Sequence, residues 1–203
     1  MTVLVLAKQP LPGRVKTRLC PPLTAEGAAQ VAAAALKDTL DVVRAVSVRR
    51  RVLVLDGVYG ADGVEVVAQR PGPMPARLAG AFDDAGDGPT LLVGMDTPQL
   101  DAALLTSACA ALDGSAAVLG PACDGGWWAL GLQHPDGALL SGVPTSRDDT
   151  GARQLAALRA AGLDVELLPA LRDVDTIEDA AAVAALAPRG RFARVLATCL
   201  GAA

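Results

Sequence analysis

The chain has 203 residues, of which 52% are hydrophobic, 2% are aromatic and 20% are charged, and its formal net charge is −4. This length is sufficient for one domain with a substantial core, so we expect residues 1–203 to form a single domain. Because the net charge is weakly negative, the composition does not favour binding to nucleic acid or to an anionic membrane.

The cysteines are widely spaced and contain no C-x-x-C pair, so the sequence predicts neither a zinc site nor a disulfide framework. No apolar run approaches the roughly 18 residues that a membrane span needs. The amino terminus has no basic region before its apolar stretch, and Lys8 interrupts that stretch early. We therefore expect a soluble cytoplasmic protein without a signal peptide or a membrane span.

Short apolar runs alternate with helical patterns along the chain. The strands are predicted at Thr2–Ala7, Arg51–Asp56, Val64–Ala68, Thr90–Gly94, Ala116–Gly120, Trp127–Leu132 and Val165–Leu168. Several of these runs are apolar at consecutive positions, which is typical of strands that are covered on both faces.

The predicted helices lie between these strands. Thr24 is a candidate cap for the helix that follows it. Another helix is expected to begin near Pro98, and a third to end at Gly162, a residue suited to a left-handed terminus. A final helix carries an apolar stripe that consists of Phe192, Val195, Leu196, Cys199 and Leu200.

The alternation of strands and helices predicts an α/β protein, a three-layer sandwich with a mostly parallel mixed sheet. One segment departs from this order. Ala116–Gly120 and Trp127–Leu132 are separated only by a short turn, which favours antiparallel pairing at that point.

A basic loop follows the first predicted strand, in the stretch LAKQPLPGRVKTRL. It carries Lys8, Arg14, Lys16 and Arg18, and ligands of open α/β sheets bind at the carboxyl ends of strands. Cations at this position are suited to phosphate groups, although a solvated surface loop would have the same composition. The stretch is neither a P-loop nor a dinucleotide-binding motif.

Carboxylates follow two further strands. Asp96 comes directly after Thr90–Gly94, where it is placed either to bind Mg²⁺ or Mn²⁺ or to cap the next helix. Asp173 and Asp175 are two residues apart, so both point to the same side of an extended backbone. They are candidate metal ligands, but Asp175 with Glu178, or Thr176 with Asp179, also fits a capping box.

Asp124 lies in a glycine-rich turn between two strands, and turn formation alone would explain it. Trp127 and Trp128 follow this turn, where one of them could stack on a ligand and at least one is expected in the core. His134 has no evident partner, and we assign it no role.

Four segments together resemble a known family, in chain order AKQPLPGRVKTRL, VGMDTPQL, GPACDGGWWALGL and DVDTIEDA. They are similar to the signature blocks of a bacterial glycosyltransferase-like family, described as arsenosugar-biosynthesis-type or radical-SAM-associated transferase 1. That family belongs to the nucleotide-diphospho-sugar transferase superfamily, which has the GT-A fold. A more distant similarity extends to 2-phospholactate and molybdenum-cofactor guanylyltransferases.

The resemblance implies roles for individual residues. Nucleotide-binding residues would be Lys8, Gly13, Arg14, Lys16, Arg18 and Arg77, and metal ligands would be Asp96, Asp173 and Asp175. Asp96, Asp124 and Lys16 would take part in catalysis, with Asp124 near the acceptor. The family's middle block appears here as GPMPARLAGAF, which keeps Arg77 but lacks the acidic partner of the family.

The sequence therefore predicts a metal-dependent transferase with a nucleotide-activated donor and a small-molecule acceptor. A nucleotide sugar as donor, with Mg²⁺ or Mn²⁺ to neutralise its diphosphate, is the leading interpretation. Alternatives are a nucleotidyltransferase that joins a nucleoside triphosphate to a phosphorylated small molecule, and a non-catalytic nucleotide-binding regulatory protein.

Overall fold

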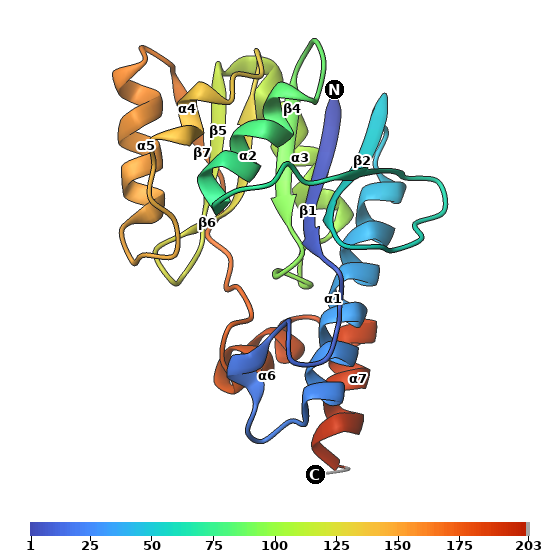
Figure 1. Cartoon of the computed structure of the whole chain (residues 1–203). Coiled ribbons are helices and arrows are strands. Elements are labelled where there is room, and N and C mark those ends of the chain that lie inside the picture. The colour runs from blue at the N-terminus through green and yellow to red at the C-terminus, as the bar shows by residue number, and fades with distance from the viewer. Residues whose placement is uncertain (202–203) are drawn as a thin grey trace.

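Seven strands form one mixed sheet within residues 1–201, the part of the chain that this computed structural model describes (Figure 1). The order across the sheet is β3 (Glu65–Ala68), β2 (Arg50–Asp56), β1 (Thr2–Lys8), β4 (Thr90–Gly94), β6 (Trp127–Leu132), β5 (Ala117–Pro121) and β7 (Val165–Leu167). Neighbouring strands are parallel, except that β6 runs antiparallel to both β4 and β5. The predicted mostly parallel mixed sheet and the antiparallel pairing of β5 with β6 are thus confirmed.

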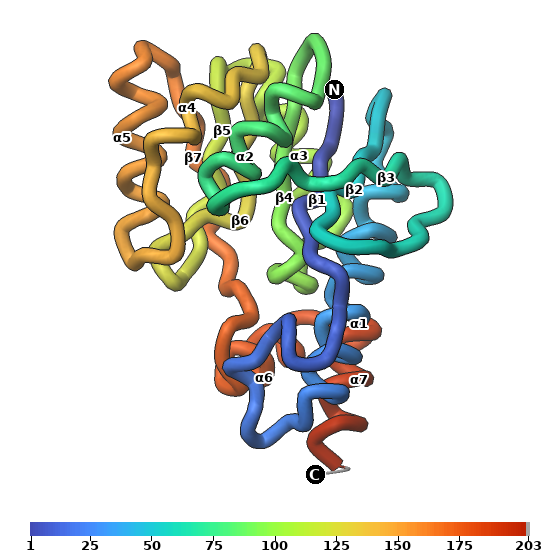
Figure 2. The backbone as a smooth tube through the Cα atoms, viewed as in Figure 1, coloured from blue at the N-terminus to red at the C-terminus, as the bar shows by residue number. Residues whose placement is uncertain are grey.

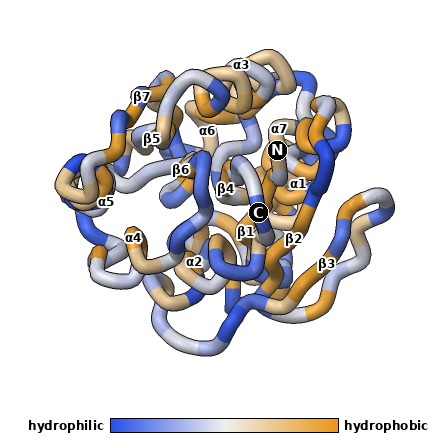
Figure 3. Tube along the Cα trace, turned by 90° about the horizontal axis from the view of Figure 1, so that it is seen from above, coloured by the Kyte–Doolittle hydropathy of each residue, from blue (hydrophilic) through white to orange (hydrophobic). Residues whose placement is uncertain are grey.

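Helices cover both faces of the sheet, which gives the three layers that the sequence predicts. The helices are α1 (Ala25–Ala45) and α3 (Ala102–Gly114) on one face, with α2 (Met74–Asp83), α4 (Ala138–Ser141) and α5 (Thr150–Ala160) on the other. Successive strand residues point to opposite faces, so Val5 packs in the cluster that contains Leu40 of α1, whereas Leu4 packs with Phe82 of α2. Figure 3 shows the strands between α3 and the α2–α4 layer.

Local capping interactions define where the helices begin and end. The side chain of Thr24 accepts a hydrogen bond from Gly27 N and starts α1, as predicted. The helix expected near Pro98 begins instead at Ala102, because the Asp101 carboxylate accepts from Leu104 N at 2.8 Å and supplies the cap. No helix in this described range is both long enough and apolar enough to cross a membrane.

The first and last parts of the chain pack together beside the sheet. Leu19, from the short 3₁₀ helix η1 (Thr17–Leu19), and the amino-terminal half of α1 share a core with α6 (Ile177–Leu186) and α7 (Arg191–Gly201). Figure 2 shows the segment after β1 passing between α6 and α1. The carboxyl-terminal helices therefore support the loop that carries the predicted phosphate-binding residues.

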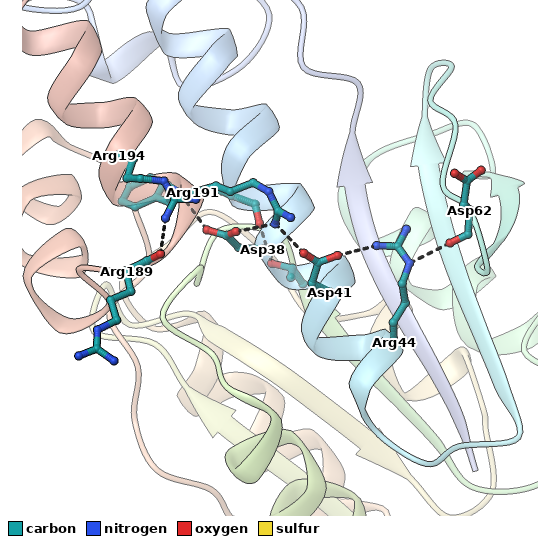
Figure 4. A network of polar contacts seen from close by, with 10 residues as sticks. Asp38, Asp41, Arg44, Asp62, Arg189, Arg191 and Arg194 are labelled. Atoms are coloured by element: carbon teal, nitrogen blue, oxygen red, sulfur yellow. Dashed lines mark hydrogen bonds and ion pairs between the residues drawn. The ribbon is translucent and has the colours of Figure 1, made fainter.

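A polar network attaches α7 to α1 (Figure 4). The Arg191 guanidinium donates to Asp38 at 3.0 Å and to Asp41 at 2.6 Å, both on α1. Arg44 donates to Asp41 at 2.9 Å and to the carbonyl of Asp62 at 2.8 Å, which extends the network to the segment before β3. The network thus holds α7 against α1, and both helices pack on the basic loop through the core around Leu19.

The strand register brings the carboxyl ends of β1, β2 and β4 to the same side of the sheet. Lys8 at the end of β1 is opposite Asp56 at the end of β2, and Leu6 is opposite Gly94 at the end of β4. Because β6 is antiparallel, its beginning at Trp127 lies toward this same side. Residues that follow β1, β2 and β4, and residues that precede β6, can therefore share one site.

Candidate functional site

A cleft of about 630 Å³ lies at this side of the sheet. Its lining includes the charged side chains Lys8, Arg14, Lys16, Arg18, Asp56, Arg77, Asp96 and Asp175. All four predicted basic residues of the loop after β1 thus face one cleft, together with two of the three predicted metal-binding carboxylates. Gly13 shapes the loop through its left-handed φ of 72° and is not among the lining residues.

Lys16 connects two sides of the cleft. Its ammonium group lies 2.5 Å from Asp96 Oδ1, and it also donates to the carbonyl of Val174. An ammonium group has three N–H donors, so these two contacts leave one donor for a ligand. The Lys16 backbone is left-handed, with φ 48°, and its side chain is only 9% exposed. The residue is therefore held in place by protein contacts on both sides.

Arg18 is paired with Asp175, but this pair is open to solvent. The side chains are 72% and 42% exposed. Exposed ion pairs contribute about 0–1 kcal/mol, so Arg18 can leave Asp175 for a phosphate group at little cost. No ion-pair partner is found for Lys8 or Arg14 in the described residues, and both line the cleft.

The segment that contains Asp173 and Asp175 lies against the end of β4. Val174 N donates to the Asp96 carbonyl at 2.9 Å. Asp96 and the segment that contains Asp173 and Asp175 are therefore neighbours in space, although they are far apart in the sequence. Capping explains none of these three carboxylates, because Asp101 caps α3 and Thr176 with Asp179 forms the capping box of α6.

The pKa of the Asp173 carboxylate is raised by its surroundings. Burial, followed by the negative charge of Asp124, raises the pKa of Asp173 from 3.8 to about 6. Asp175 also raises this pKa, whereas Lys16 lowers it. The Asp173 side chain therefore lies in a region of excess negative charge, where a cation would be stabilising.

The metal prediction can be compared with the donor set. Among residues 1–201, no group of three or more His, Cys, Asp or Glu side chains is close enough to hold a metal ion. Mg²⁺, however, is usually bound by one or two carboxylates together with substrate phosphates. Asp96 and Asp173, which line a common cavity, fit such a site, and their hard oxygen donors suit Mg²⁺ or Mn²⁺.

Arg77 has an acidic partner that the sequence reading did not identify. Its guanidinium donates to Asp56 at 2.8 Å, and this hydrogen bond lowers the pKa of Asp56. Asp56 is the last residue of β2, and a carboxylate at the carboxyl end of a predicted strand was the available signal. Arg77 also donates to Gln69 at 3.3 Å. Through its contacts with Asp56 and Gln69, Arg77 attaches the start of α2 to the carboxyl end of β2.

A second cavity of about 280 Å³ adjoins the cleft and shares Leu6, Met74, Gly94 and Asp96 with it. Asp124 and Asp173 line this second cavity but not the cleft. Asp124 Oδ1 also accepts from Gly126 N at 2.7 Å, so turn formation and a position in the cavity are compatible.

The two tryptophans have different surroundings. Trp128 is buried, and its indole N–H donates to the Pro169 carbonyl at 3.0 Å, which confirms the expectation that one tryptophan belongs to the core. Both tryptophans border the second cavity, but Trp127 is half-buried whereas Trp128 is only 2% exposed. The cavity wall also includes the loop residues Thr145, Ser146 and Arg147, which the sequence reading did not assign to the site.

Comparisons with known proteins agree with this architecture. A family model described as an uncharacterized protein conserved in bacteria, DUF2064, matches residues 24–147. A proposed nucleotide-diphospho-sugar transferase from Desulfovibrio desulfuricans G20 superimposes with a TM-score of 0.87 at 24% identity, over 97% of this chain and 94% of that one. A search of curated proteins gives no match to this sequence.

Two further solved structures have the same fold. Rv0371c from Mycobacterium tuberculosis H37Rv, in complex with manganese, gives a TM-score of 0.58 at 23% identity over 90% of this chain and 96% of that one. CMP:2-keto-3-deoxy-manno-octonic acid synthetase, in complex with CTP, gives a TM-score of 0.60 at 11% identity. The superposition covers 93% of this chain and 98% of that one. The fold is thus that of nucleotide-diphospho-sugar transferases and nucleotidyltransferases.

Proposed function

Starting from the fact that this chain belongs to the bacterial DUF2064 family, we propose that it is a metal-dependent transferase with a nucleotide sugar as donor. One observation carries the proposal. The loop after β1 directs its cations into a cleft at the carboxyl ends of three parallel strands, beside the carboxylate of Asp96. Within the family, the four sequence blocks favour the arsenosugar-biosynthesis-type branch.

Donor binding rests on the basic residues of the cleft. Lys8 and Arg14 would contact the diphosphate directly, because no described acidic side chain pairs with them. Arg18 would join them after leaving Asp175, and its planar guanidinium is suited to a bidentate phosphate contact. This cluster holds phosphate groups in place and stabilises the charge of a departing diphosphate.

Lys16 has a different proposed role from the other cations. Because two of its donors are used by Asp96 and Val174, it would hold these two segments at a fixed separation. Its remaining donor is available to a phosphate oxygen. Lys16 would therefore link the position of the donor to the position of Asp96.

The divalent ion would be held by Asp96 and Asp173, with Asp175 available after Arg18 has moved. Such an ion neutralises charge on the diphosphate of the donor. The presence of manganese in the structure of Rv0371c, which has the same fold, supports the use of a divalent ion. Asp124 would lie on the acceptor side, since it lines the second cavity and not the cleft.

The structural neighbours also favour a second candidate function. CMP:2-keto-3-deoxy-manno-octonic acid synthetase binds CTP, and 2-C-methyl-D-erythritol 4-phosphate cytidylyltransferase from Thermus thermophilus shares the fold. A nucleotidyltransferase would use the same cleft for a nucleoside triphosphate and would release pyrophosphate. The two functions therefore differ in the product that leaves the cleft.

A binding and product assay tests the proposal. The protein is screened by thermal shift against nucleoside triphosphates and nucleotide sugars, with and without Mn²⁺, and the nucleotides that bind are then incubated with candidate acceptors. We expect stabilisation by a nucleotide sugar that depends on Mn²⁺, with release of a nucleoside mono- or diphosphate. Release of pyrophosphate would establish the nucleotidyltransferase, and binding without any product would favour the regulatory protein.

A further inference from the structure

The second cavity is enclosed by segments from both halves of the sheet. Its walls come from the ends of β1 and β4, the Asp124–Gly126 turn before β6, and the loop of residues 145–150. That loop packs directly on the turn, because a Cβ atom on Gly125 would overlap the backbone of Asp148, and Gly151 N at the start of α5 donates to the Gly125 carbonyl at 2.7 Å. The cavity opens beside Asp96, which also lines the cleft, so a molecule bound in it would lie next to the donor.

Thr97 supplies an unused polar group beside this cavity. The residue lines the cavity and is only 2% exposed, yet its Oγ1 has no hydrogen-bond partner within residues 1–201. Buried polar groups in native proteins nearly always have a partner, and an exception calls for an explanation. A hydroxyl can donate and accept, so a ligand hydroxyl group in the cavity would satisfy Thr97.

The charge of the cavity is opposite to that of the cleft. Asp96, Asp124 and Asp173 line it, and Arg147 is its one basic residue in the described chain. Arg147 lies 3.3 Å from Asp149, so the charges of these two exposed side chains offset each other. The charge of a divalent ion on Asp96 and Asp173 would be balanced by these two carboxylates, and the donor phosphates would be balanced by the cations of the cleft, which leaves Asp124 uncompensated. An anionic acceptor would therefore be repelled here, whereas the adjoining cleft attracts anions.

Part of the cavity surface is apolar. Leu78, Leu92 and the exposed part of Trp127 line it, and an indole face packs well against the C–H face of a sugar or polyol. Its volume of about 280 Å³ lies just below the range of about 300–1,000 Å³ that is usual for drug-sized ligands, so the cavity suits a smaller molecule.

From these observations we infer that the second cavity binds the acceptor, and that this acceptor is a small uncharged molecule with a hydroxyl group and an apolar face. The inference rests on the proposed transferase function and specifies its second substrate. It separates the two enzymatic candidates, because a nucleotidyltransferase of the alternative type needs a phosphorylated acceptor.

The corresponding transfer balances as follows. The acceptor oxygen forms a bond to the anomeric carbon of the donor sugar, and the bond from that carbon to the phosphate oxygen breaks. The electron pair of the broken bond leaves with the nucleotide, and the hydroxyl proton passes to the carboxylate of Asp124. The acceptor thus enters as a neutral alcohol and leaves as a neutral glycoside.

Trp127 provides a direct reporter for this inference. In a Trp128→Phe variant the remaining tryptophan is the half-buried Trp127, whereas in the matched Trp127→Phe variant the remaining tryptophan borders the cavity but is only 2% exposed. Each variant is titrated with paired probes, glucose against glucose 6-phosphate and glycerol against glycerol 3-phosphate, in the presence of a nucleoside diphosphate and Mn²⁺. We expect a neutral probe to change Trp127 fluorescence at a concentration at least tenfold lower than its phosphorylated partner does.

A response to phosphorylated probes at equal or lower concentration, or to neither class, would overturn the inference. Thr97→Val keeps the shape of the side chain and should weaken neutral-probe binding about tenfold, whereas the exposed control Thr106→Val should not. Unchanged binding to Thr97→Val would also overturn it. Nucleotide binding is measured by thermal shift on the same samples. Its absence would refute the transferase function, whereas nucleotide binding with a phosphorylated acceptor would refute the acceptor inference alone.

Discussion

Lys16 and Asp96 form an ion pair across the site, with Nζ 2.5 Å from Oδ1, although they belong to the loop after β1 and to the end of β4. The lysine also donates to the carbonyl of Val174, so one side chain joins three segments. Its position is more restricted than those of the other cations of the basic loop, Lys8, Arg14 and Arg18.

Lys16→Met should therefore weaken nucleotide binding about tenfold, because a charge-assisted contact is lost and Asp96 loses its partner. Asp96 is half-exposed, so we expect a stability loss of only about 1 kcal/mol in urea denaturation. Lys37→Met, at an exposed position of α1, is the matched control. Nucleotide affinity equal to that of the wild type would contradict the proposed role of Lys16.

Arg14→Ala tests the phosphate contacts in the cleft. A hydrogen bond between charged groups contributes about 1.5–3 kcal/mol, which corresponds to a roughly tenfold to hundredfold loss of nucleotide affinity. Calorimetric titration with the nucleotide identified by thermal shift measures this loss. Arg159→Ala removes an exposed arginine of α5 and should have no effect. Equal affinities for the two variants would show that Arg14 does not contact the donor.

Asp96→Asn and Asp173→Asn test the proposed metal-binding carboxylates. Both variants should fold and lose the stabilisation by nucleotide that depends on Mn²⁺, since an amide is a weaker ligand for a hard cation. The control is Asp101→Ala, which removes the observed cap of α3 and should cost about 1 kcal/mol of stability while binding is retained. If both Asp variants kept the Mn²⁺ dependence, the proposed ligand set would be wrong.

Asp173 should also affect stability as a function of pH. Its pKa in the folded protein is about 6, against an ordinary value of 3.8, so between these values the folded chain keeps a proton that the unfolded chain has lost. The free energy of unfolding should therefore fall as pH rises through this window. Asp173→Asn should flatten the fall and raise stability at pH 7 by about 1–2 kcal/mol, after allowance for solvent screening.

Urea denaturation from pH 4 to pH 8, without metal or nucleotide, measures this effect. Asp113→Asn, at an exposed position of α3, is the matched control and should keep the wild-type profile. A variant at Asp173 with the same pH profile as the wild type would show that its carboxylate is not in the environment described.

Gly125 is needed where the turn before β6 meets the loop of residues 145–150. Its φ is 88°, and a Cβ atom there would overlap the backbone of Asp148. Gly86 has a similar φ of 79° but has free space around it. Gly86→Ala should cost about 1–2 kcal/mol from backbone strain alone, and Gly125→Ala about 1–3 kcal/mol more from overpacking. Equal thermal stability of the two variants would contradict the packing described.

The sequence was most informative where burial or local hydrogen bonding determines the structure. β4 and β6 have the predicted limits because their apolar runs are buried in the sheet. The start of α3 was misplaced because Pro98 is a common first-turn residue, whereas Asp101 makes the actual cap. The cations of the basic loop were identifiable because they are close together in the sequence.

Contacts between distant segments could not be predicted in the same way. The pairing of Arg77 with Asp56 depends on how α2 returns over the end of β2, and no local pattern encodes that return. The unpartnered hydroxyl of Thr97 is visible only after all surrounding side chains are placed. Likewise, Asp173 and Asp175 are two residues apart, yet they line different cavities on either side of Val174.

The packing of the first loop against the last helices has a consequence for protein synthesis. Lys16 and Val174 are separated by 158 positions, and the core around Leu19 is completed by Phe192 and Leu196 of α7. Contacts of such long sequence separation form late, because closing a long chain segment is entropically costly. During translation the loop after β1 cannot complete this core until Phe192 and Leu196 have left the ribosome. The nascent chain can thus acquire much of its sheet before it completes the proposed nucleotide site.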